Sequence, residues 1–182
     1  MRSEHLADAV LAGPPRLGDV RVLAIDGPSG AGKSCLAAEV TEVLRARGVR
    51  TALVSTDDFA TWDDPVAWWP RLADGVLTPL AKGLPGRYRR TEWAGGTPRP
   101  GLFVDVDVPE VLVLEGVSAG RTSVRPVLTY LHWIAGPDAP QRLERAVARD
   151  GEDSRAHLSA WQEFERGWFA VDGTAAAADN AG

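Results

Sequence analysis

Short runs of apolar residues alternate along this chain with segments whose apolar positions recur every three or four residues. The runs have the length and residue types of buried strands and lie at residues 20–25, 51–55, 111–114 and 128–135. Helical spacing is found at residues 3–12, 33–47, 137–148 and 156–170. Residues 20–55 read as strand, glycine-rich turn, helix and strand, which predicts a right-handed βαβ unit with parallel strands. The pattern therefore predicts an α/β fold with a mainly parallel sheet flanked by helices.

Residues 60–101 interrupt this regular alternation. They are rich in Trp, Pro and Gly and show helical spacing only at residues 66–73 and 76–81. Long irregular segments in a compact domain commonly carry binding functions, so we interpret this stretch as an acceptor-binding insert. The small and polar residues 173–182 predict a flexible tail. A chain of 182 residues fits a single domain, which we place at residues 1–182.

Composition narrows the range of partners. The 20 Lys and Arg residues against 25 Asp and Glu residues give a net charge of −5, so no overall basic field attracts nucleic acid or an anionic membrane. No run approaches the ~18 apolar residues of a membrane span. Cys35 is the only cysteine, which excludes an intrachain disulfide and favours a reducing compartment. We expect a cytoplasmic protein that binds neither nucleic acid nor membranes.

One motif lies between the first predicted strand and the helix that follows it. Residues 27–34 read GPSGAGKS and match the P-loop pattern G-x-x-x-x-G-K-[ST] in the strand–turn–helix context that the pattern requires. Glycines let successive backbone N–H groups curl around a phosphate at a helix N-terminus, where the helix dipole favours negative charge. Lys33 is expected to contact the β- and γ-phosphates, and the Ser34 hydroxyl is short enough to ligate the bridging Mg²⁺. The residues expected at the nucleotide are Gly27, Pro28, Ser29, Gly30, Ala31, Gly32, Lys33, Ser34 and Cys35.

Carboxylates follow two predicted strands at the edge of the sheet where ligands bind in α/β folds. Asp57 and Asp58 come after the second strand, where a carboxylate accepts a hydroxyl proton or helps to hold Mg²⁺; a helix cap is the alternative. Glu115 ends the third strand, as an acid does in a Walker B element near Mg²⁺; the alternative is a carboxylate held by loop N–H groups. We therefore expect Ser34 and Glu115 to form the metal environment.

Basic and aromatic residues supply the remaining candidates. Arg142, Arg145 and Arg149 share one helical stripe, which we interpret as a catalytic lid over a triphosphate; a solvated face paired with acids is the alternative. Four of the seven Trp residues fall in the insert. Tyr88 and Trp93 are candidates for the wall of an acceptor pocket, and core packing is the alternative.

Four segments of the chain, GPSGAGKS at 27–34, TDDF at 56–59, VLVLEGV at 111–117 and RLERAVARD at 142–150, resemble the uridine kinase family of P-loop nucleoside kinases. This family includes nicotinamide riboside kinases and is related to phosphoribulokinase and pantothenate kinase. The resemblance implies a P-loop NTPase fold in which Asp57 is the base for the acceptor hydroxyl.

The resemblance also implies roles at the acceptor and in the lid. Asp63 or Asp64 in WDDP corresponds to the acid that holds the ribose hydroxyls, and Tyr88 corresponds to an aromatic residue that stacks near the base. Asp58 is expected at the substrate as well. The acid-glycine pair after the third strand corresponds to residues 115–116, and the lid arginines correspond to Arg142, Arg145 and Arg149.

The chain departs from the family at two places. Its lid, at about residues 149–157, is shorter and more acidic than the family's arginine-rich lid. No apolar strand follows the last predicted helix, so we expect one edge strand of the family's usual five to be missing. A free strand edge favours association, which makes a homo-oligomer one expected remedy.

The function expected from these observations is transfer of the γ-phosphoryl group of ATP, with Mg²⁺, to the hydroxyl of a small molecule. The foremost acceptor is the 5′-hydroxyl of a nucleoside, as in uridine or cytidine kinases. One alternative is a kinase for another small metabolite, of the nicotinamide riboside or pantothenate type. The other is a non-catalytic regulatory protein that binds a nucleotide.

Overall fold

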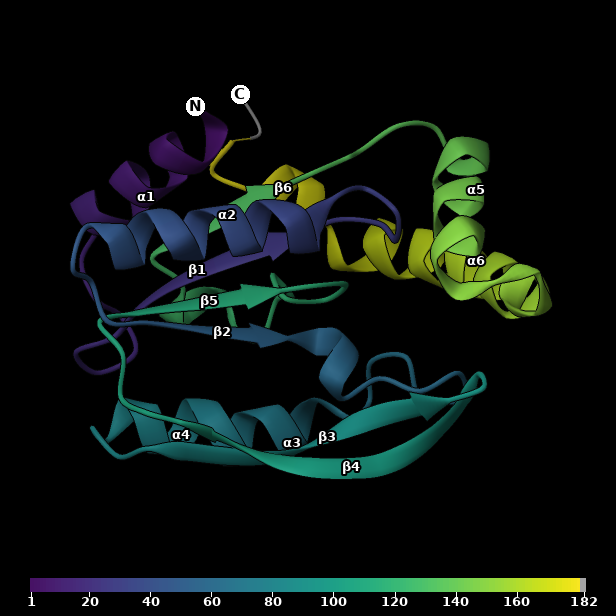
Figure 1. Ribbon diagram of the computed structural model, residues 1–182. Helices are drawn as coiled ribbons and strands as arrows, with labels where there is room; N and C mark the ends of the chain where they lie inside the picture. The colour runs from purple at the N-terminus through teal and green to yellow at the C-terminus, as the bar shows by residue number, and fades with distance from the viewer. Residues whose placement is uncertain (181–182) are drawn as a thin grey trace.

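A four-stranded parallel sheet with helices on both faces forms the body of the protein in the computed structural model, which describes residues 1–180 (Figure 1). The strand order is β2-β5-β1-β6. The strands are β1 (Arg21–Asp26), β2 (Thr51–Ser55), β5 (Val111–Glu115) and β6 (Tyr130–Trp133). β1 and β5 lie in the centre and are almost entirely buried, because both of their faces are covered. The predicted α/β fold is confirmed.

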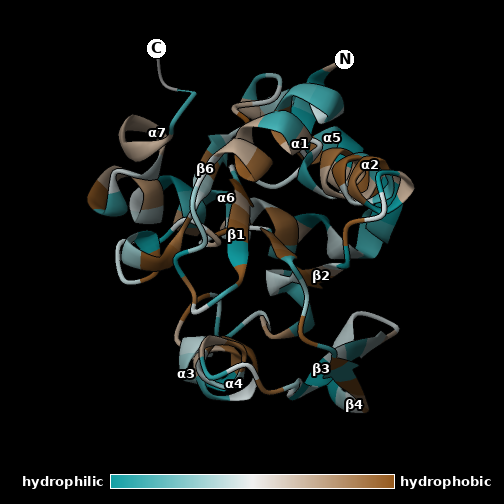
Figure 2. Cartoon of the chain, turned by 90° about the vertical axis from the view of Figure 1, so that its left-hand side faces the viewer, coloured by the Kyte–Doolittle hydropathy of each residue, from teal (hydrophilic) through white to brown (hydrophobic). Residues whose placement is uncertain are grey.

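Side chains on the two faces of the sheet enter two different cores. Leu23 of β1 packs against α1 (Arg2–Ala12) and α2 (Lys33–Ala46), whereas its neighbour Ala24 belongs to the core on the opposite face. Successive side chains of a strand point to opposite faces, so a continuous apolar run serves both cores. In Figure 2, β1 and stretches of α1 and α2 carry the brown colour of hydrophobic residues.

The two helical patches predicted in the insert form one continuous helical stretch. It consists of α3 (Trp69–Leu72), a π-helical turn (Ala73–Leu77) and α4 (Thr78–Ala81). Leu72 and Leu80 are fully buried in the core on the face of the sheet opposite to α1 and α2. The stretch therefore covers part of the second face of the sheet.

The rest of the insert is an antiparallel hairpin, which the sequence pattern does not predict. It is formed by β3 (Gly86–Ala94) and β4 (Thr97–Val106), so the insert extends five residues beyond the expected boundary at residue 101. Gly95 and Gly96 join the strands with φ angles of 57° and 78°, as a two-residue type I′ turn requires. Most hairpin residues are exposed, and therefore the strands lack the apolar alternation that identifies a half-buried strand.

Two helices form an arm beside the carboxyl ends of the strands (Figure 1). α5 (Ala139–Asp150) is capped at its N-terminus by Asp138, whose carboxylate accepts a hydrogen bond from the Gln141 N–H at 2.9 Å. A 3₁₀ turn (Glu152–Ser154) leads into α6 (Arg155–Asp172). The expected lid at residues 149–157 is thus the corner of a helical hairpin.

The C-terminal residues lie along the free edge of β6. α7 (Thr174–Ala177) follows α6, and the Asp179 N–H donates to the Leu131 carbonyl at 2.9 Å. The Asp179 carboxylate accepts the Leu131 N–H at 2.7 Å, and the Asn180 amide exchanges hydrogen bonds of 2.8 and 2.9 Å with the Trp133 backbone. These contacts connect residues 179 and 180 to β6. The flexible tail at residues 173–182 stays a prediction, and its last two residues lie outside the described residues.

The tail occupies the edge where the fifth strand of the family is expected. No fifth strand joins the main sheet within residues 1–180, as the sequence predicts. The tail meets the hydrogen-bonding needs of this edge within one chain, and a homo-oligomer stays a prediction. Within the same residues, no helix has the length and apolar character needed to cross a membrane.

Candidate active site

The P-loop connects β1 to α2 and contains glycines for two different reasons. Gly32 has a φ of 102°, and a Cβ on it would meet no atom within 4 Å, so its backbone conformation requires glycine and the space beside it is open. A Cβ on Gly27 would lie 2.1 Å from the Ile134 carbonyl oxygen, and one on Gly30 would lie 2.6 Å from the Arg142 carbonyl oxygen. The loop is therefore held against its neighbours on one side and leaves room at the start of α2.

Lys33 is the first residue of α2 and is only 8% exposed. Its Nζ donates a hydrogen bond to the Pro28 carbonyl at 3.0 Å, so the side chain folds back over the loop. The ammonium charge therefore lies against the backbone of the loop. A lysine held in this way can contact the β- and γ-phosphates of a bound nucleotide.

Three oxygen-bearing side chains meet between α2 and the ends of β2 and β5. The Glu115 carboxylate accepts the Ser34 hydroxyl at 3.2 Å and the Ser55 hydroxyl at 2.5 Å. Burial raises the pKa of Glu115, and the nearby charge of Asp57 raises it further, while the Ser55 hydrogen bond and Lys33 oppose the shift. A cation beside Ser34 and Glu115 would relieve the repulsion between the two carboxylates.

The donors in this cluster suit Mg²⁺, which prefers hard oxygen ligands and keeps several waters or phosphate oxygens. Within the described part of the chain, no group of three or more His, Cys, Asp or Glu residues is arranged to hold a metal ion. Ser34 and Glu115 supply two such oxygen donors beside the P-loop.

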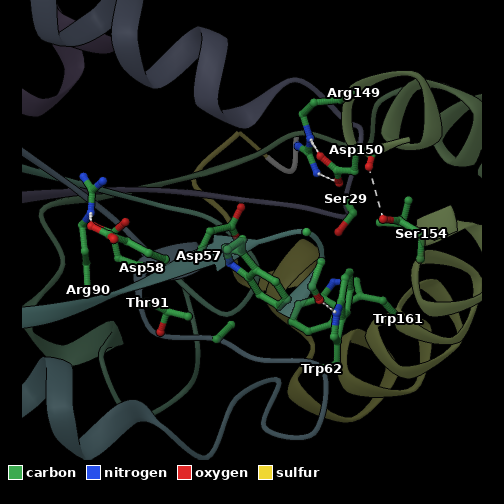
Figure 3. A pocket seen from close by; sticks show the side chains of 16 residues that line it. Ser29, Asp57, Asp58, Trp62, Arg90, Thr91, Arg149, Asp150, Ser154 and Trp161 are labelled. Atoms are coloured by element: carbon green, nitrogen blue, oxygen red, sulfur yellow. Dashed lines mark hydrogen bonds and ion pairs between the residues drawn. The ribbon is translucent and has the colours of Figure 1, made fainter. Parts of the chain in front are cut away.

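A cavity of about 930 Å³ opens beside the P-loop (Figure 3). Segments that are distant in the sequence form its walls. These are Ser29 of the P-loop, Asp57 and Asp58 after β2, Trp62, Arg90 and Trp93 of the insert, and Arg149, Asp150 and Trp161 of the helical arm. Of the predicted site residues, the cavity brings together Ser29, Asp57, Asp58, Trp93 and Arg149.

Asp57 and Asp58 are adjacent in the chain but have different surroundings. The Asp58 carboxylate accepts the Tyr88 hydroxyl at 2.6 Å, which fixes its orientation. The Asp57 N–H donates to the Ser55 hydroxyl at 3.2 Å, while no hydrogen bond within residues 1–180 holds the Asp57 carboxylate. Asp57 therefore presents a free carboxylate to the cavity.

Tyr88 is 5% exposed and is not among the residues that line the cavity. Its ring stacks on Phe59 at a centroid distance of 4.7 Å, and burial together with the Asp58 hydrogen bond raises the pKa of its hydroxyl. The expected wall residue is thus a buried support for Asp58, since the hairpin strand that carries Tyr88 turns its side chain into the core.

The aromatic wall is formed around Trp62 instead. Its ring lies 4.9 Å from the Trp93 ring and 6.1 Å from the Trp161 ring, both in edge contacts, and stacks on His157 at 5.0 Å. The indole N–H donates to the Gly96 carbonyl at 3.0 Å, which connects the loop to the hairpin turn. The sequence analysis selects Trp93 for this wall but misses Trp62. The feature of the sequence that could have identified Trp62 is its position four residues after Asp58.

The acids of WDDP do not line the 930 Å³ cavity. The Asp64 carboxylate accepts the N–H groups of Ala67 at 2.8 Å and Trp68 at 3.2 Å and so caps the turn before α3. The Asp63 carboxylate accepts the Thr61 hydroxyl at 2.8 Å and faces a smaller cavity of about 380 Å³. The structure thus shows local hydrogen bonds for both acids, and their contact with a ribose stays a prediction.

The three arginines that were expected to form one stripe have different surroundings. Arg149 lines the large cavity and forms a two-point contact with Asp150, with distances of 2.6 Å. The Arg142 guanidinium donates to the Pro137 carbonyl at 2.7 Å, beside the P-loop, and Arg145 is exposed on the surface of α5. The Asp150 contact raises the pKa of Arg149, and the charges of Asp57 and Glu115 add to the shift. Of the three arginines, Arg149 is therefore the one that stands near the carboxylates of Asp57 and Glu115.

Two further features bear on the expected site. Arg90, which sequence reasoning does not select, lines the large cavity from the hairpin. Cys35 is exposed on the first turn of α2 and does not line that cavity.

Comparisons with known proteins yield solved structures but no sequence family. No protein-family model matches this chain, and no curated protein sequence matches it. A candidate uridine kinase from Bacillus stearothermophilus superposes with a TM-score of 0.62 at 20% identity, over 91% of this chain and 94% of that one. A candidate fructose transport system kinase from a Silicibacter species gives a TM-score of 0.65 at 17% identity, over 98% and 95% of the two chains.

A D-glycerate 3-kinase from Cryptococcus neoformans is also similar, with a TM-score of 0.51 at 17% identity, over 93% of this chain and 69% of that one. At these identities the likeness establishes architecture and leaves the substrate open. The P-loop, the parallel sheet and the three similar structures together show that this chain has the fold of P-loop small-molecule kinases.

Proposed function

We propose that this protein is an enzyme that transfers the γ-phosphoryl group of ATP to a hydroxyl of a nucleoside. The observation that carries the proposal is the single cavity that joins the P-loop to a free carboxylate and a guanidinium group. Ser29, Asp57 and Arg149 all line it. Phosphoryl transfer needs these three elements within reach of one acceptor molecule.

The nucleotide side of the reaction is assigned to the P-loop and its neighbours. The backbone N–H groups at the start of α2 bind phosphate oxygens, and Lys33 contributes a charge at the β- and γ-phosphates. Ser34 and Glu115 hold Mg²⁺, directly or through water. When bound, Mg²⁺ neutralises charge that develops on the phosphate oxygens.

The acceptor side is assigned to the far wall of the cavity. Asp57 takes the proton of the acceptor hydroxyl while the hydroxyl oxygen forms a bond to the γ-phosphorus. The bond between the γ-phosphorus and the β–γ bridging oxygen breaks, and ADP leaves. Arg149, which lines the same cavity, is assigned to stabilise charge on the transferred group. Tyr88 keeps Asp58 in place beside the base.

A nucleoside is the favoured acceptor because the cavity has an aromatic wall. Trp62, Trp93 and Trp161 offer ring surfaces on which a planar base can stack. Glycerate, which has no ring, would make little use of this wall. Nicotinamide riboside also has a planar ring and is therefore a candidate acceptor as well.

An acceptor screen with coupled detection of ADP release tests this function. Uridine and cytidine are expected to stimulate turnover more than pantothenate, fructose or glycerate, and nicotinamide riboside is the closest competitor. Nucleotide binding without turnover on any acceptor would instead indicate a regulatory protein. Preference for a non-planar acceptor would keep the kinase assignment and overturn the nucleoside assignment.

A further inference from the structure

A carboxylate from α6 reaches the P-loop. Glu165 is 1% exposed, and its carboxylate accepts the Ser29 N–H at 3.0 and 3.1 Å and the Ser29 hydroxyl at 2.9 Å. The contact joins residues 136 positions apart in the chain. Neither the P-loop motif nor the helical pattern of α6 calls for an acid here, since residues one and two turns earlier, Trp161 and Leu158, are apolar.

A buried carboxylate is costly unless charges and hydrogen bonds compensate for the loss of water. Burial raises the pKa of Glu165, and the Ser29 hydrogen bonds and the charges of Lys33 and Arg142 oppose that shift. An apolar side chain at this position would pack without any of these partners. Packing of α6 alone therefore does not account for an acid at this position.

The hydrogen bonds identify the group on which Glu165 acts. The peptide unit between Pro28 and Ser29 donates its N–H to Glu165 and accepts the Lys33 ammonium on its carbonyl at 3.0 Å. A peptide unit is planar, so its N–H and its carbonyl turn together. Any rotation that breaks the Glu165 contact also moves the carbonyl away from Lys33.

The same loop is clamped by the start of the helical arm. Gly30 lies so close to α5 that a Cβ on it would stand 2.6 Å from the Arg142 carbonyl oxygen. A Cβ on Gly136 would stand 2.6 Å from the Cα of Ala31. The P-loop thus contacts α5 through close backbone packing and α6 through Glu165, and the arm that carries Arg149 is fixed relative to the phosphate site.

We propose that Glu165 is a positioning residue of the nucleotide site, which holds the Pro28–Ser29 peptide in the orientation that places Lys33 for phosphate. The proposal rests on the proposed function, because it assigns phosphate binding to the loop. It adds a residue outside the P-loop motif, and it makes α6 a structural part of nucleotide binding.

Calorimetric titration with Mg-ADP, together with thermal unfolding, tests the proposal. Glu165→Ala is expected to weaken nucleotide affinity about tenfold, as loss of a hydrogen bond to a charged group does, with the acceptor KM unchanged. Glu165→Gln keeps the shape and one oxygen acceptor and is expected to recover part of the loss. Glu163→Gln is the matched control, since this glutamate on the same helix is exposed and pairs with Arg166 on the surface.

A double-mutant cycle shows whether Glu165 acts through Lys33. Glu165→Ala is expected to cost several-fold less nucleotide affinity in a Lys33→Ala background than in the wild type, because the ammonium that it positions is gone. Equal losses in both backgrounds would overturn the proposal and leave Glu165 a residue of fold stability alone. If Glu165→Ala does not fold, the affinity loss caused by Glu165→Gln is compared in the wild-type and Lys33→Ala backgrounds instead.

The outcomes also separate this proposal from the proposed function. Wild-type protein that fails to bind Mg-ADP overturns both. Wild-type protein that binds Mg-ADP, with Glu165 variants that bind it equally well, overturns the positioning role only. Binding that falls in the Glu165 variants, and falls by less in the Lys33→Ala background, supports the positioning role whether or not any acceptor is phosphorylated.

Discussion

At the scale of single residues, the site depends on which polar groups are already engaged and which are free. The Asp58 carboxylate is bound by the Tyr88 hydroxyl, and the Glu115 carboxylate by two serine hydroxyls. The Asp57 carboxylate has no hydrogen-bond partner within residues 1–180 and faces the cavity. A general base must be free to accept a proton, so these three acids have different capacities for chemistry.

Asp57→Asn separates the role of the base from the role of the metal environment. It preserves shape but removes the charge that accepts the proton, so kcat is expected to fall about 10²–10⁴-fold with nucleotide affinity retained. Rapid-mix assays at saturating ATP measure the first quantity, and titration with Mg-ADP measures the second.

Asp58→Asn is the control for this substitution. An asparagine oxygen still accepts the Tyr88 hydroxyl, so the change is expected to affect kcat far less than Asp57→Asn. The reverse ranking of the two variants would move the base to Asp58. Loss of Mg-ADP binding in Asp57→Asn would place that carboxylate in the Mg²⁺ environment.

Lys33→Ala tests the P-loop itself. The ammonium is expected to contact phosphate in both the ground state and the transition state, so affinity and turnover should fall together by about 2–4 kcal/mol. Lys82→Ala is a matched control, because Lys82 is the only other lysine and is exposed. Wild-type turnover in Lys33→Ala would contradict the assignment of the loop.

At the scale of elements, the parts that could be predicted are those with a local signal. β1 and β5 read as apolar runs because both of their faces are buried, and the P-loop is identified by its spacing between a strand and a helix. The hairpin carries no such signal. Leu102 and Phe103 are neighbours in β4 and are 72% and 57% exposed, so burial does not impose an alternating pattern.

The aromatic wall could not be predicted for a different reason. Trp62, Trp93 and Trp161 come from a loop, a hairpin and a helix that meet only in the tertiary structure. A list of tryptophans does not distinguish such a wall from core packing, and Trp68 is indeed a core residue at 2% exposure. The free carboxylate of Asp57, by contrast, follows a strand directly and could be selected from its place in the chain.

Trp62→Ala tests the wall as an element of acceptor binding. Its ring contacts two other cavity residues, so its loss is expected to raise the acceptor KM about tenfold and leave Mg-ADP affinity unchanged. Steady-state kinetics with uridine and ADP titration measure the two effects. Trp62→Phe keeps an aromatic face and should recover most of the loss; an unchanged KM in Trp62→Ala would remove the wall from the acceptor site.

At the scale of the whole molecule, the C-terminal residues take part in the stability of the sheet. Asp179 and Asn180 satisfy backbone groups of Leu131 and Trp133 that would otherwise form a free strand edge. Replacing both side chains by alanine is expected to lower the free energy of unfolding by about 1–3 kcal/mol and to promote association at high concentration. Denaturant titration and light scattering measure these effects. Unchanged values in both would show that the edge does not depend on the tail.

The pH dependence of stability is a second property of the whole molecule, because two buried groups act on it in opposite directions. Burial raises the pKa of Asp26 to about 7, so its contribution to stability falls as the pH rises from the unfolded value near 4. Burial lowers the pKa of His132 to about 4, and the charges of Arg2 and His5 act in the same direction. The folded state therefore binds fewer protons at His132 than the unfolded state does between about pH 4 and pH 6.5.

His132→Leu isolates the second contribution. His132 is 8% exposed, and its Nδ1 is buried without a hydrogen-bond partner in the described residues, so an apolar side chain of similar size fits the site without a polar loss. His132 contributes less to stability as the pH falls from about 6.5 towards 4, so the free energy of unfolding of the variant should rise relative to wild type by about 2–3 kcal/mol between pH 7.5 and pH 4.5. Urea denaturation at a series of pH values measures the difference, and the Asp26 contribution cancels because both proteins contain it. Above pH 7 the two stability curves should run parallel, since the histidine is then neutral in both states. A constant difference between the two proteins from pH 7.5 down to pH 4.5 would mean that His132 is as readily protonated in the folded sheet as in the unfolded chain.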